Sequence, residues 1–394
     1  MYFVPYLFVC IVLFSFSLPL YNSYTNHKAA RIYNVFFNEF FAFSILLVFI
    51  GLRGFIFSDV FSYYPFYEKV PSLFFDNFNL SRYLKTNGWE KGYLLYAVVC
   101  KTLFPNYFVF QFVSTFIDFL LFRKCVQNYL PEKSRKFAYL FFYVFYGLII
   151  EINLLRNVKA ILIFLFSIKY IGKDLKKYCL LIIFACFFHK FSIVYLPLYI
   201  LFKKRWNRKT TLMIWIVGNV FFLLQIPLFT KAVLTAVNFL PANIYTTAIK
   251  AYFSSDLYSQ SYGLGLGYIE RQISFLIAFH YSKKVYFEKN VAYIFFNIFY
   301  IYCFVFLFFS DISIFVERVP YLFAAGYWFL FPYIYLSLAR KEKRAFLVYF
   351  FLLSILKVVS GNNNILVSYR FCFFDNYEQR LSLFNKNIKL LLGD

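Results

Sequence analysis

Long apolar stretches separated by short polar segments dominate the chain. They lie at roughly residues 2–20, 36–52, 92–104, 107–122, 138–152, 155–172, 178–202, 209–228, 267–282, 291–309, 319–339 and 345–360. Most have the length of about 15–25 residues that a helix needs to cross a hydrocarbon layer about 30 Å thick. Because apolar and polar residues do not alternate within them, they are typical of helices and not of strands. The pattern predicts an all-α, polytopic integral membrane protein with about 11–12 transmembrane helices.

The same pattern predicts a single integral membrane domain over residues 1–394. The longest polar segments are two loops, 53–91 and 229–266, and a tail, 361–394. The apolar N-terminus, residues 1–20, has no basic segment and no cleavage site, so we expect a first span there and not a signal peptide.

Composition supports a membrane location. Hydrophobic residues make up 62% of the 394 residues, whereas soluble domains have roughly 45–50%. The net charge of +23 could indicate a nucleic-acid partner, but the basic residues lie in short loops between apolar stretches. That distribution is typical of the positive-inside bias, so we expect membrane lipids and no nucleic acid as partners. The 7 cysteines show no CxxC or metal-ligand spacing, so we expect no metal and no cofactor.

Five basic clusters orient the chain. The positive-inside rule places all of them in the cytoplasm: residues 123–136, 173–177, 203–209, 283–289 and 340–344. Loops 53–91 and 229–266, the turn at 152–156, the segment 310–318, the N-terminus and the tail then lie outside. The stretch 178–202 joins two cytoplasmic clusters, so we expect a broken hairpin that turns near His189, where polar side chains interrupt the apolar run.

Several cationic side chains fall on the outer side, against the topology rule. They are Arg53, Arg156, Arg271, Arg318 and His189. Ionisable residues inside a membrane usually face a cavity or a partner, and arginine pairs bidentately with phosphate. We therefore predict an outward-facing cationic site suited to phosphate. The alternative is structural: Glu151, Glu270 and Glu317 lie close in sequence to three of the arginines, and arginines near span ends also extend toward lipid headgroups.

The first outer loop supplies acidic and aromatic candidates. Asp59 and Glu90 are carboxylates that can deprotonate a sugar hydroxyl, as can His189. The rings of Tyr63, Tyr64 and Tyr67 can pack on pyranose rings, or they can anchor the loop at the membrane surface.

Four segments in this order resemble the EpsG family, which groups with Wzy-type O-antigen and capsule polymerases. They are LRG…SDVFSYY from Leu52, WEKGY from Trp89, LLRNVKAILIFLFSIKYI from Leu154 and CFFHKFSIVYLPLYIL from Cys186. The resemblance covers roughly residues 30–205 and is weaker beyond them.

The resemblance implies a metal-independent membrane glycosyltransferase in the bacterial plasma (inner) membrane. Such a polymerase moves a growing glycan from an undecaprenyl-pyrophosphate carrier to another lipid-linked repeat unit, at the periplasmic or exterior face. We expect Arg156 and Arg318 to bind pyrophosphate with support from Arg53 and Arg271, and His189, Asp59 or Glu90 to act as base. A chain-length regulator is an expected partner.

Two other functions fit an outward-facing membrane protein. A flippase for the same lipid-linked units should show internal repeats and charges along a whole pathway, and the chain has no evident repeat. An O-antigen ligase usually carries one large outer loop near its C-terminal third, with which loop 229–266 is compatible.

Overall fold

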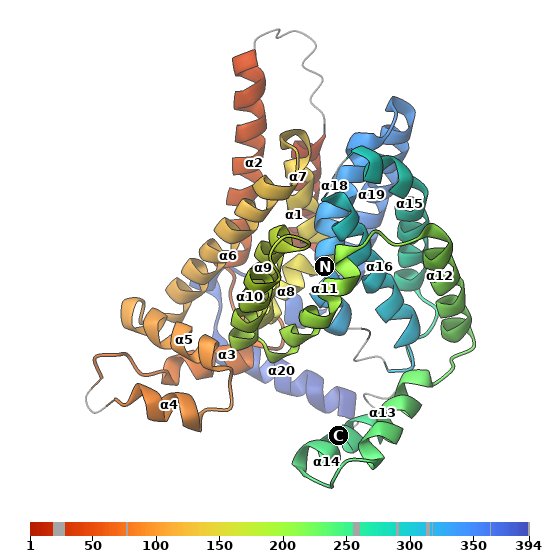
Figure 1. The fold of residues 1–394 in the computed structure, drawn as a ribbon. Coiled ribbons are helices and arrows are strands. Elements are labelled where there is room, and N and C mark those ends of the chain that lie inside the picture. Colours follow the sequence, from red (N-terminus) through yellow and green to blue (C-terminus); the bar gives the residue numbers. More distant parts are fainter. Residues whose placement is uncertain are drawn as a thin grey trace. The chain divides into compact units, whose positions relative to one another are not determined.

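A computed structural model describes residues 1–18, 28–75, 78–254, 261–288, 291–312, 316, 318–362 and 364–392 (Figure 1). Within these residues every regular element is a helix, and the only β contact is an isolated bridge between Arg53 and Phe371. The all-helical prediction is confirmed for this part of the chain. The chain packs into two units, one formed by Met1–Leu198 with Leu338–Asp394 and the other by Tyr199–Ser337. Each is described by itself.

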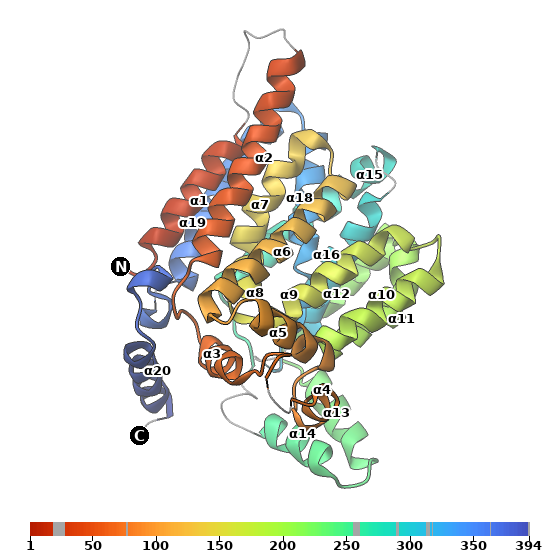
Figure 2. The ribbon, with the colours of Figure 1, turned by 90° about the vertical axis from the view of Figure 1, so that its left-hand side faces the viewer.

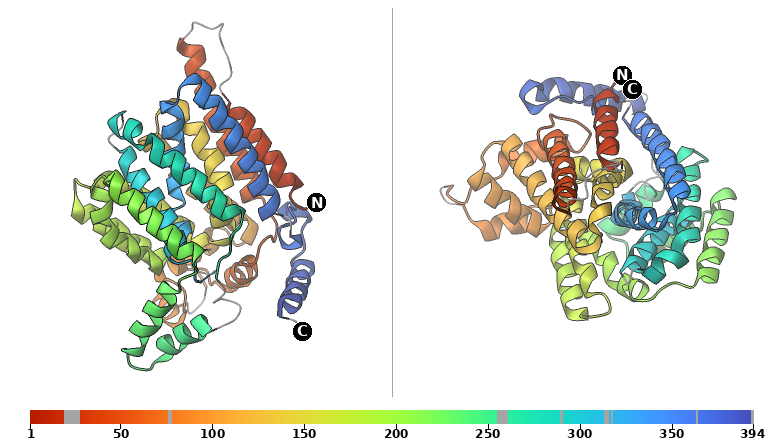
Figure 3. Two further views of the ribbon diagram at one scale, coloured as in Figure 1. Left: turned by 90° about the vertical axis from the view of Figure 1, so that its right-hand side faces the viewer. Right: turned by 90° about the horizontal axis from the view of Figure 1, so that it is seen from above.

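The core of the first unit is a group of packed helices of 6 to 24 residues. They are α1 (Val4–Ser17), α2 (Lys28–Gly51), α6 (Tyr107–Tyr129), α7 (Arg135–Phe142), α8 (Leu148–Asn153) and α19 (Arg340–Gly361). Helix α1 packs against α2, α7 and α19, and α2 also packs against α6 (Figures 2 and 3). The Tyr143 hydroxyl donates to Tyr6 O at 2.8 Å, and the Tyr6 hydroxyl donates to Val367 O at 2.7 Å. Backbone carbonyls thus satisfy the polar ends of these buried rings.

The predicted outer loop 53–91 is partly helical. It contains α3 (Val60–Lys69) and α4 (Leu80–Thr86), and the short apolar stretch that follows forms α5 (Lys91–Leu103). The Asn79 side chain accepts the Arg82 backbone N–H at 2.9 Å and so caps α4. Because α3 packs on α6, and α5 on both α4 and α10 (Leu175–Phe188), the loop is built into the first unit.

The helix predicted to break near His189 does so. Helix α10 ends at Phe188, and His189 has extended backbone with φ −152° and ψ 113°. A 3₁₀ turn (Lys190–Val194) leads into α11 (Tyr195–Lys203). The Tyr178 hydroxyl donates to Tyr195 O at 2.6 Å, so the chain doubles back beside α10 as a hairpin. Helix α10 also packs closely on α9 (Leu155–Ser167).

The second unit is centred on α16 (Ala292–Phe308). Around it pack α12 (Arg208–Leu223), α15 (Leu266–Glu288) and α18 (Ala325–Ser337), the last preceded by a 3₁₀ turn (Val319–Phe323). The predicted loop 229–266 contains most of α13 (Leu228–Asn238) and all of α14 (Ile244–Ser254). A Cβ at Gly326 would lie 2.8 Å from Phe299 Cα, so this glycine allows α18 to approach α16 closely.

The described helices include candidates for membrane spans. Two helical segments, Glu132–Asn153 and Arg340–Gly361, are long and apolar enough to cross a bilayer, the first of them kinked at Phe145 and Tyr146. Three shorter apolar helices are Val4–Ser17, Phe37–Gly51 and Ala292–Phe308. Along α19, Val348, Leu352 and Leu356 recur every four residues and are more than half exposed. Soluble proteins rarely leave such a continuous apolar face uncovered.

Candidate functional site

Arg156 and Glu90 form the centre of the candidate site in the first unit. Arg156 lies in the first turn of α9, and Glu90 directly precedes α5. Arg156 Nη1 lies 2.5 Å from Glu90 Oε2, and Arg156 Nε donates to the Tyr63 hydroxyl at 3.3 Å. The guanidinium also stacks over the Trp89 ring, 4.7 Å from its centroid. Three groups thus orient one guanidinium, whose side chain remains 30% exposed.

His189 lies on the other side of Glu90. Its Nδ1 is 3.7 Å from Glu90 Oε1, within range of a charge interaction though long for a hydrogen bond. The Lys190 backbone N–H donates to the same oxygen at 3.5 Å. The break at His189 therefore directs the hairpin tip at the carboxylate. Glu90 joins the predicted loop 53–91 to the predicted hairpin.

Gly92 allows this meeting of α5 and α10. An added Cβ at Gly92 would lie 2.7 Å from Phe187 Cβ and 2.8 Å from Phe187 O. Real Cβ atoms do not approach other atoms this closely, so only glycine fits at this contact. Because Gly92 is two residues after Glu90 and Phe187 is two residues before His189, the close contact controls the distance between those side chains.

The surroundings of Glu90 keep its carboxylate ionised. Burial on its own would raise the pKa of Glu90, but the adjacent His189 and the charge of Arg156 lower the pKa to about 2. A pKa lowered this far from 4.5 corresponds to about 3 kcal/mol in favour of the charged form. A carboxylate with so low a pKa accepts protons weakly at neutral pH. The ionised Glu90 carboxylate is therefore suited to orient the side chains of Arg156 and His189.

Asp59 lies at the start of α3, one turn before Tyr63. Its backbone N–H donates to Asn153 Oδ1 at 2.8 Å, and its carboxylate accepts the Ser58 hydroxyl at 3.2 Å. Asn153 belongs to the turn that leads into Arg156, so the Asp59 backbone is fixed to the same turn that carries the arginine. The Asp59 side chain is half-buried.

Arg53 is 2% exposed and bonds only within the fold in its described contacts. Its Nη1 donates to Ile50 O at 2.7 Å and its Nη2 to Ile152 O at 3.3 Å. It thereby ties the end of α2 to the end of α8. Contact with a ligand would require those bonds to break.

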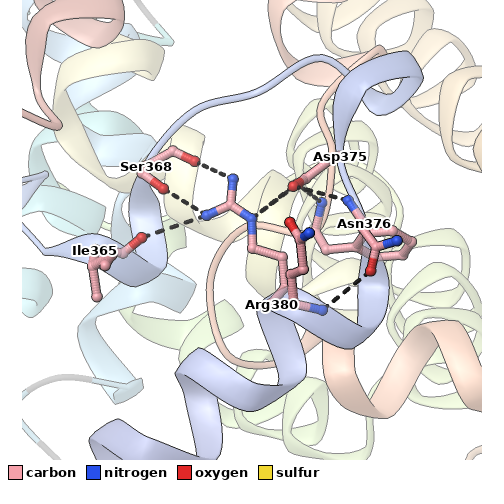
Figure 4. A network of polar contacts seen from close by, with 7 residues as sticks. Ile365, Ser368, Asp375, Asn376 and Arg380 are labelled. Atoms are coloured by element: carbon pink, nitrogen blue, oxygen red, sulfur yellow. Dashed lines mark hydrogen bonds and ion pairs between the residues drawn. The ribbon is translucent and has the colours of Figure 1, made fainter.

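The C-terminal tail forms hydrogen bonds with the segment that follows Arg53 (Figure 4). The Gly54 N–H donates to Arg370 O, and the Phe55 N–H donates to Asp375 Oδ2, both at 2.9 Å. Asp375 is paired in turn with Arg380, whose guanidinium also binds Ser368. Sequence analysis left this tail without a role, because nothing local links residues more than 300 positions apart.

The charged groups behind Arg156 are structural. Lys159, one turn further along α9, donates to Asp118 Oδ2 at 2.6 Å and to Ser114 Oγ at 2.8 Å. All three side chains are buried. Glu151 is also buried and does not bond Arg156, so the pairing of these two residues that sequence position suggested is wrong. Arg156 pairs with Glu90, 66 positions away.

The three tyrosines occupy different environments. Tyr63 is 4% exposed and lies edge-on to Trp89. Tyr67 is 1% exposed, stacks on Phe110 and donates its hydroxyl to Phe104 O at 2.7 Å. Tyr64 is half-buried against Phe55. The half-buried aromatic face beside Arg156 is that of Trp89, which lies in the same predicted outer loop as the three tyrosines.

Arg271 and Arg318 belong to the second unit. Arg271 Nη1 donates to Gly267 O at 2.8 Å, and its guanidinium lies 4.1 Å from the centroid of the Phe306 ring. Arg318 is exposed at the start of the 3₁₀ turn before α18. Glu270 accepts the Tyr327 hydroxyl. Glu317, the suggested partner of Arg318, lies outside the described residues.

Metal-binding clusters are absent from the described part of the chain, where no three His, Cys, Asp or Glu side chains are placed to hold an ion. In comparisons with known proteins, the model of the EpsG family matches residues 38–371. No curated protein and no solved structure matches the chain.

Proposed function

Because the chain belongs to the EpsG family of polysaccharide-related membrane proteins, we propose that it is a lipid-linked glycan polymerase. It transfers a glycan from an undecaprenyl-pyrophosphate carrier to another lipid-linked repeat unit, at the outer face of the bacterial plasma membrane. The apolar stretches form about 11–12 spans, and the exposed apolar face of α19 contacts lipid. A chain-length regulator is a proposed partner.

The observation that carries the proposal is the Arg156–Glu90–His189 cluster. Arg156 uses Nε and Nη1 within the protein, while its side chain stays 30% exposed. The ion pair and the Trp89 ring fix the guanidinium before a substrate arrives. A preorganised cation next to a lipid-linked pyrophosphate can receive the negative charge that forms as this group leaves.

The reaction assigns a role to each group. The acceptor hydroxyl loses its proton to a base, and its oxygen bonds to the anomeric carbon of the donor. The bond from that carbon to the pyrophosphate oxygen breaks, and its electron pair stays on the pyrophosphate. We assign the base to His189, with Asp59 as the alternative, because the lowered pKa of Glu90 makes that carboxylate a weak proton acceptor.

The arginines divide into two groups in this proposal. Arg156 binds the leaving pyrophosphate, and Arg318 and Arg271 are further proposed ligands. Arg53 positions the loop through its bonds to Ile50 and Ile152. Removing one donor that stabilises a transition-state anion costs about 3–4 kcal/mol, or about 10²–10³ in rate, in other enzymes. We expect a loss of that size for Arg156→Ala.

A glycan ladder from a strain that lacks the gene tests the proposal. The strain is complemented with wild type, Arg156→Ala, His189→Ala or Arg370→Ala, the last a control at an exposed arginine of the same unit. We expect single displayed repeats in the deletion strain, and long chains only with wild type and the control. Loss of all display would instead indicate a flippase, and long chains left on the carrier would indicate a ligase.

A further inference from the structure

A second concave surface lies in the first unit beside the candidate site. It is a cleft of about 870 Å³ lined by the end of α3, the helix α4 and the end of α5. Pockets for small ligands commonly measure about 300–1,000 Å³, so the cleft has room for an oligosaccharide segment. None of the residues assigned above to the reaction lines it.

Aromatic and hydrogen-bonding residues both line the cleft. Phe74, Phe75, Phe78 and Tyr83 provide ring faces, and Asn79, Thr86 and Thr102 provide polar groups. Phe78 and Tyr83 pack edge to face with their centroids 5.7 Å apart, while Phe74 is 86% exposed at the rim. Sugar rings have apolar faces bordered by hydroxyls, and this combination of surfaces matches them.

The cleft is also cationic. Lys69, Arg82 and Lys101 line it, with Glu68 as its only lining carboxylate among the described residues. The Lys101 ammonium already has partners within the protein. Its Nζ lies 3.8 Å from Glu68 Oε2 and donates to Pro105 O at 2.9 Å. The exposed side chains of Lys69 and Arg82 form no ion pair in the described part of the chain. A concave surface with unpaired cations favours an anionic ligand.

Packed side chains connect the cleft with the candidate site. The Phe66 ring stacks on Trp89, with centroids 4.3 Å apart, and it packs against a buried cluster of Val70, Ala97 and Val98, on which Phe78 and Tyr83 also pack. Helix α3 carries Tyr63 at the site and Lys69 at the cleft. Six residues of helix rise about 9 Å, which is about the length of one or two sugar rings.

We propose that the cleft binds an acidic portion of the repeat-unit glycan, one or two sugars from the reacting end. The aromatic rings contact the sugar faces, and Lys69 and Arg82 pair with a carboxylate or an acidic substituent. This inference rests on the proposed function and adds to it that the substrate is an anionic glycan.

Titration of the purified protein in nanodiscs of neutral lipid tests the cleft. The probe is the repeat-unit oligosaccharide released by mild acid from the lipid carrier of producing cells, used before and after reduction of its carboxyl groups or removal of acidic substituents. The variants are Lys69→Ala/Arg82→Ala and Lys85→Ala, a control at an exposed lysine of α4 that does not line the cleft.

We expect wild type and Lys85→Ala to bind the acidic probe equally. The double variant should bind it at least ten-fold more weakly, and the neutralised probe should bind wild type at least ten-fold more weakly. A neutral repeat unit, or equal binding of both probes, would overturn the inference. A third outcome would also overturn the inference: the double variant binds the acidic probe normally but no longer associates with vesicles of anionic lipid. In that case the cleft would face the membrane surface.

The Arg156→Ala variant tests binding in the cleft independently of the proposed polymerase activity. It should bind the probe like wild type while making no polymer. If the ladder shows that the chain is not a polymerase, the difference between Lys85→Ala and the double variant still decides what the cleft binds.

Discussion

Replacement of Gly92 by alanine should inactivate the protein without touching a proposed catalytic group. The new Cβ would lie 2.7 Å from Phe187 Cβ and 2.8 Å from Phe187 O, where ordinary contacts begin at 3.4 Å. Because one obstacle is a backbone atom, a rotamer change cannot relieve the clash. Helices α5 and α10 must therefore separate by about 0.7 Å.

That separation moves Glu90 relative to His189, since each lies two residues from the clash. Overpacking of this kind costs about 1–3 kcal/mol of stability, and a misplacement of about 1 Å at a reacting centre can lower the rate about 10²-fold. Alanine has a higher helix propensity than glycine by about 1 kcal/mol, which partly offsets the loss of stability. We therefore expect a large loss of activity and a small loss of stability.

The assay is the rate of polymer formation at matched amounts of inserted protein, together with thermal unfolding in detergent. Gly88→Ala is the matched control, because an added Cβ there meets nothing within 4 Å. We expect the control to match wild type in both measurements. Normal polymerisation by Gly92→Ala would refute the argument that this contact sets the geometry of the site.

Three further predictions follow from other contacts. Tyr63→Phe removes one hydrogen bond to Arg156, worth about 0.5–1.5 kcal/mol, so the polymerisation rate should fall about 2–10-fold; an unchanged rate would exclude Tyr63 from orienting the guanidinium. The folded pKa of Glu90, about 2, lies below its ordinary value of 4.5, so its contribution to stability is full above pH 4.5 and is lost as the pH falls toward 2. Unfolding at a series of pH values should therefore show that Glu90→Gln destabilises at pH 5 and by progressively less in stronger acid, and a difference that does not shrink below pH 4.5 would contradict the lowered pKa. Arg380→Ala leaves a buried Asp375 unpaired and should destabilise the protein by about 3–5 kcal/mol in thermal unfolding, whereas Arg370→Ala, at an exposed side chain, should not; equal stability of the two variants would contradict the tail contact.

Some of the fold was evident from the sequence. The break at His189 could be predicted because a His-Lys pair interrupts an apolar run between two basic loops, and the chain turns there. Loop 53–91 was predicted as a polar connection. Its helices were missed because α3 and α4, with 10 and 7 residues, are too short to be stable alone and are stabilised by packing on neighbouring helices.

The site was predicted only in part. Arg156, Glu90 and His189 were identified one by one, from charge on the predicted outer side and from motif order. Their meeting depends on the glycine contact between α5 and α10, which no local pattern encodes. Glu151 is the acidic residue nearest to Arg156 in sequence, but it is not the partner of Arg156. The first turn of a helix can contact a side chain from any element that packs beside it.

The role of Arg53 could not be predicted from the sequence, for a different reason. The topology rule places an arginine at the outer end of α2, but it cannot distinguish a guanidinium that faces a ligand from one that binds backbone carbonyls. The structure buries Arg53 against Ile50 and Ile152. The attachment of the next two residues to the tail could not be predicted either, because the hydrogen bonds that Gly54 and Phe55 donate to Arg370 and Asp375 join opposite ends of the sequence.

Reconstitution tests the central claim most directly. Purified protein in liposomes is supplied with undecaprenyl-pyrophosphate-linked repeat units and no nucleotide sugar, and products are separated by size. We expect a ladder of glycans with wild type and Arg370→Ala, and a rate at least about 10²-fold lower with Arg156→Ala. Single repeat units with wild type, or an equal ladder with Arg156→Ala, would contradict it.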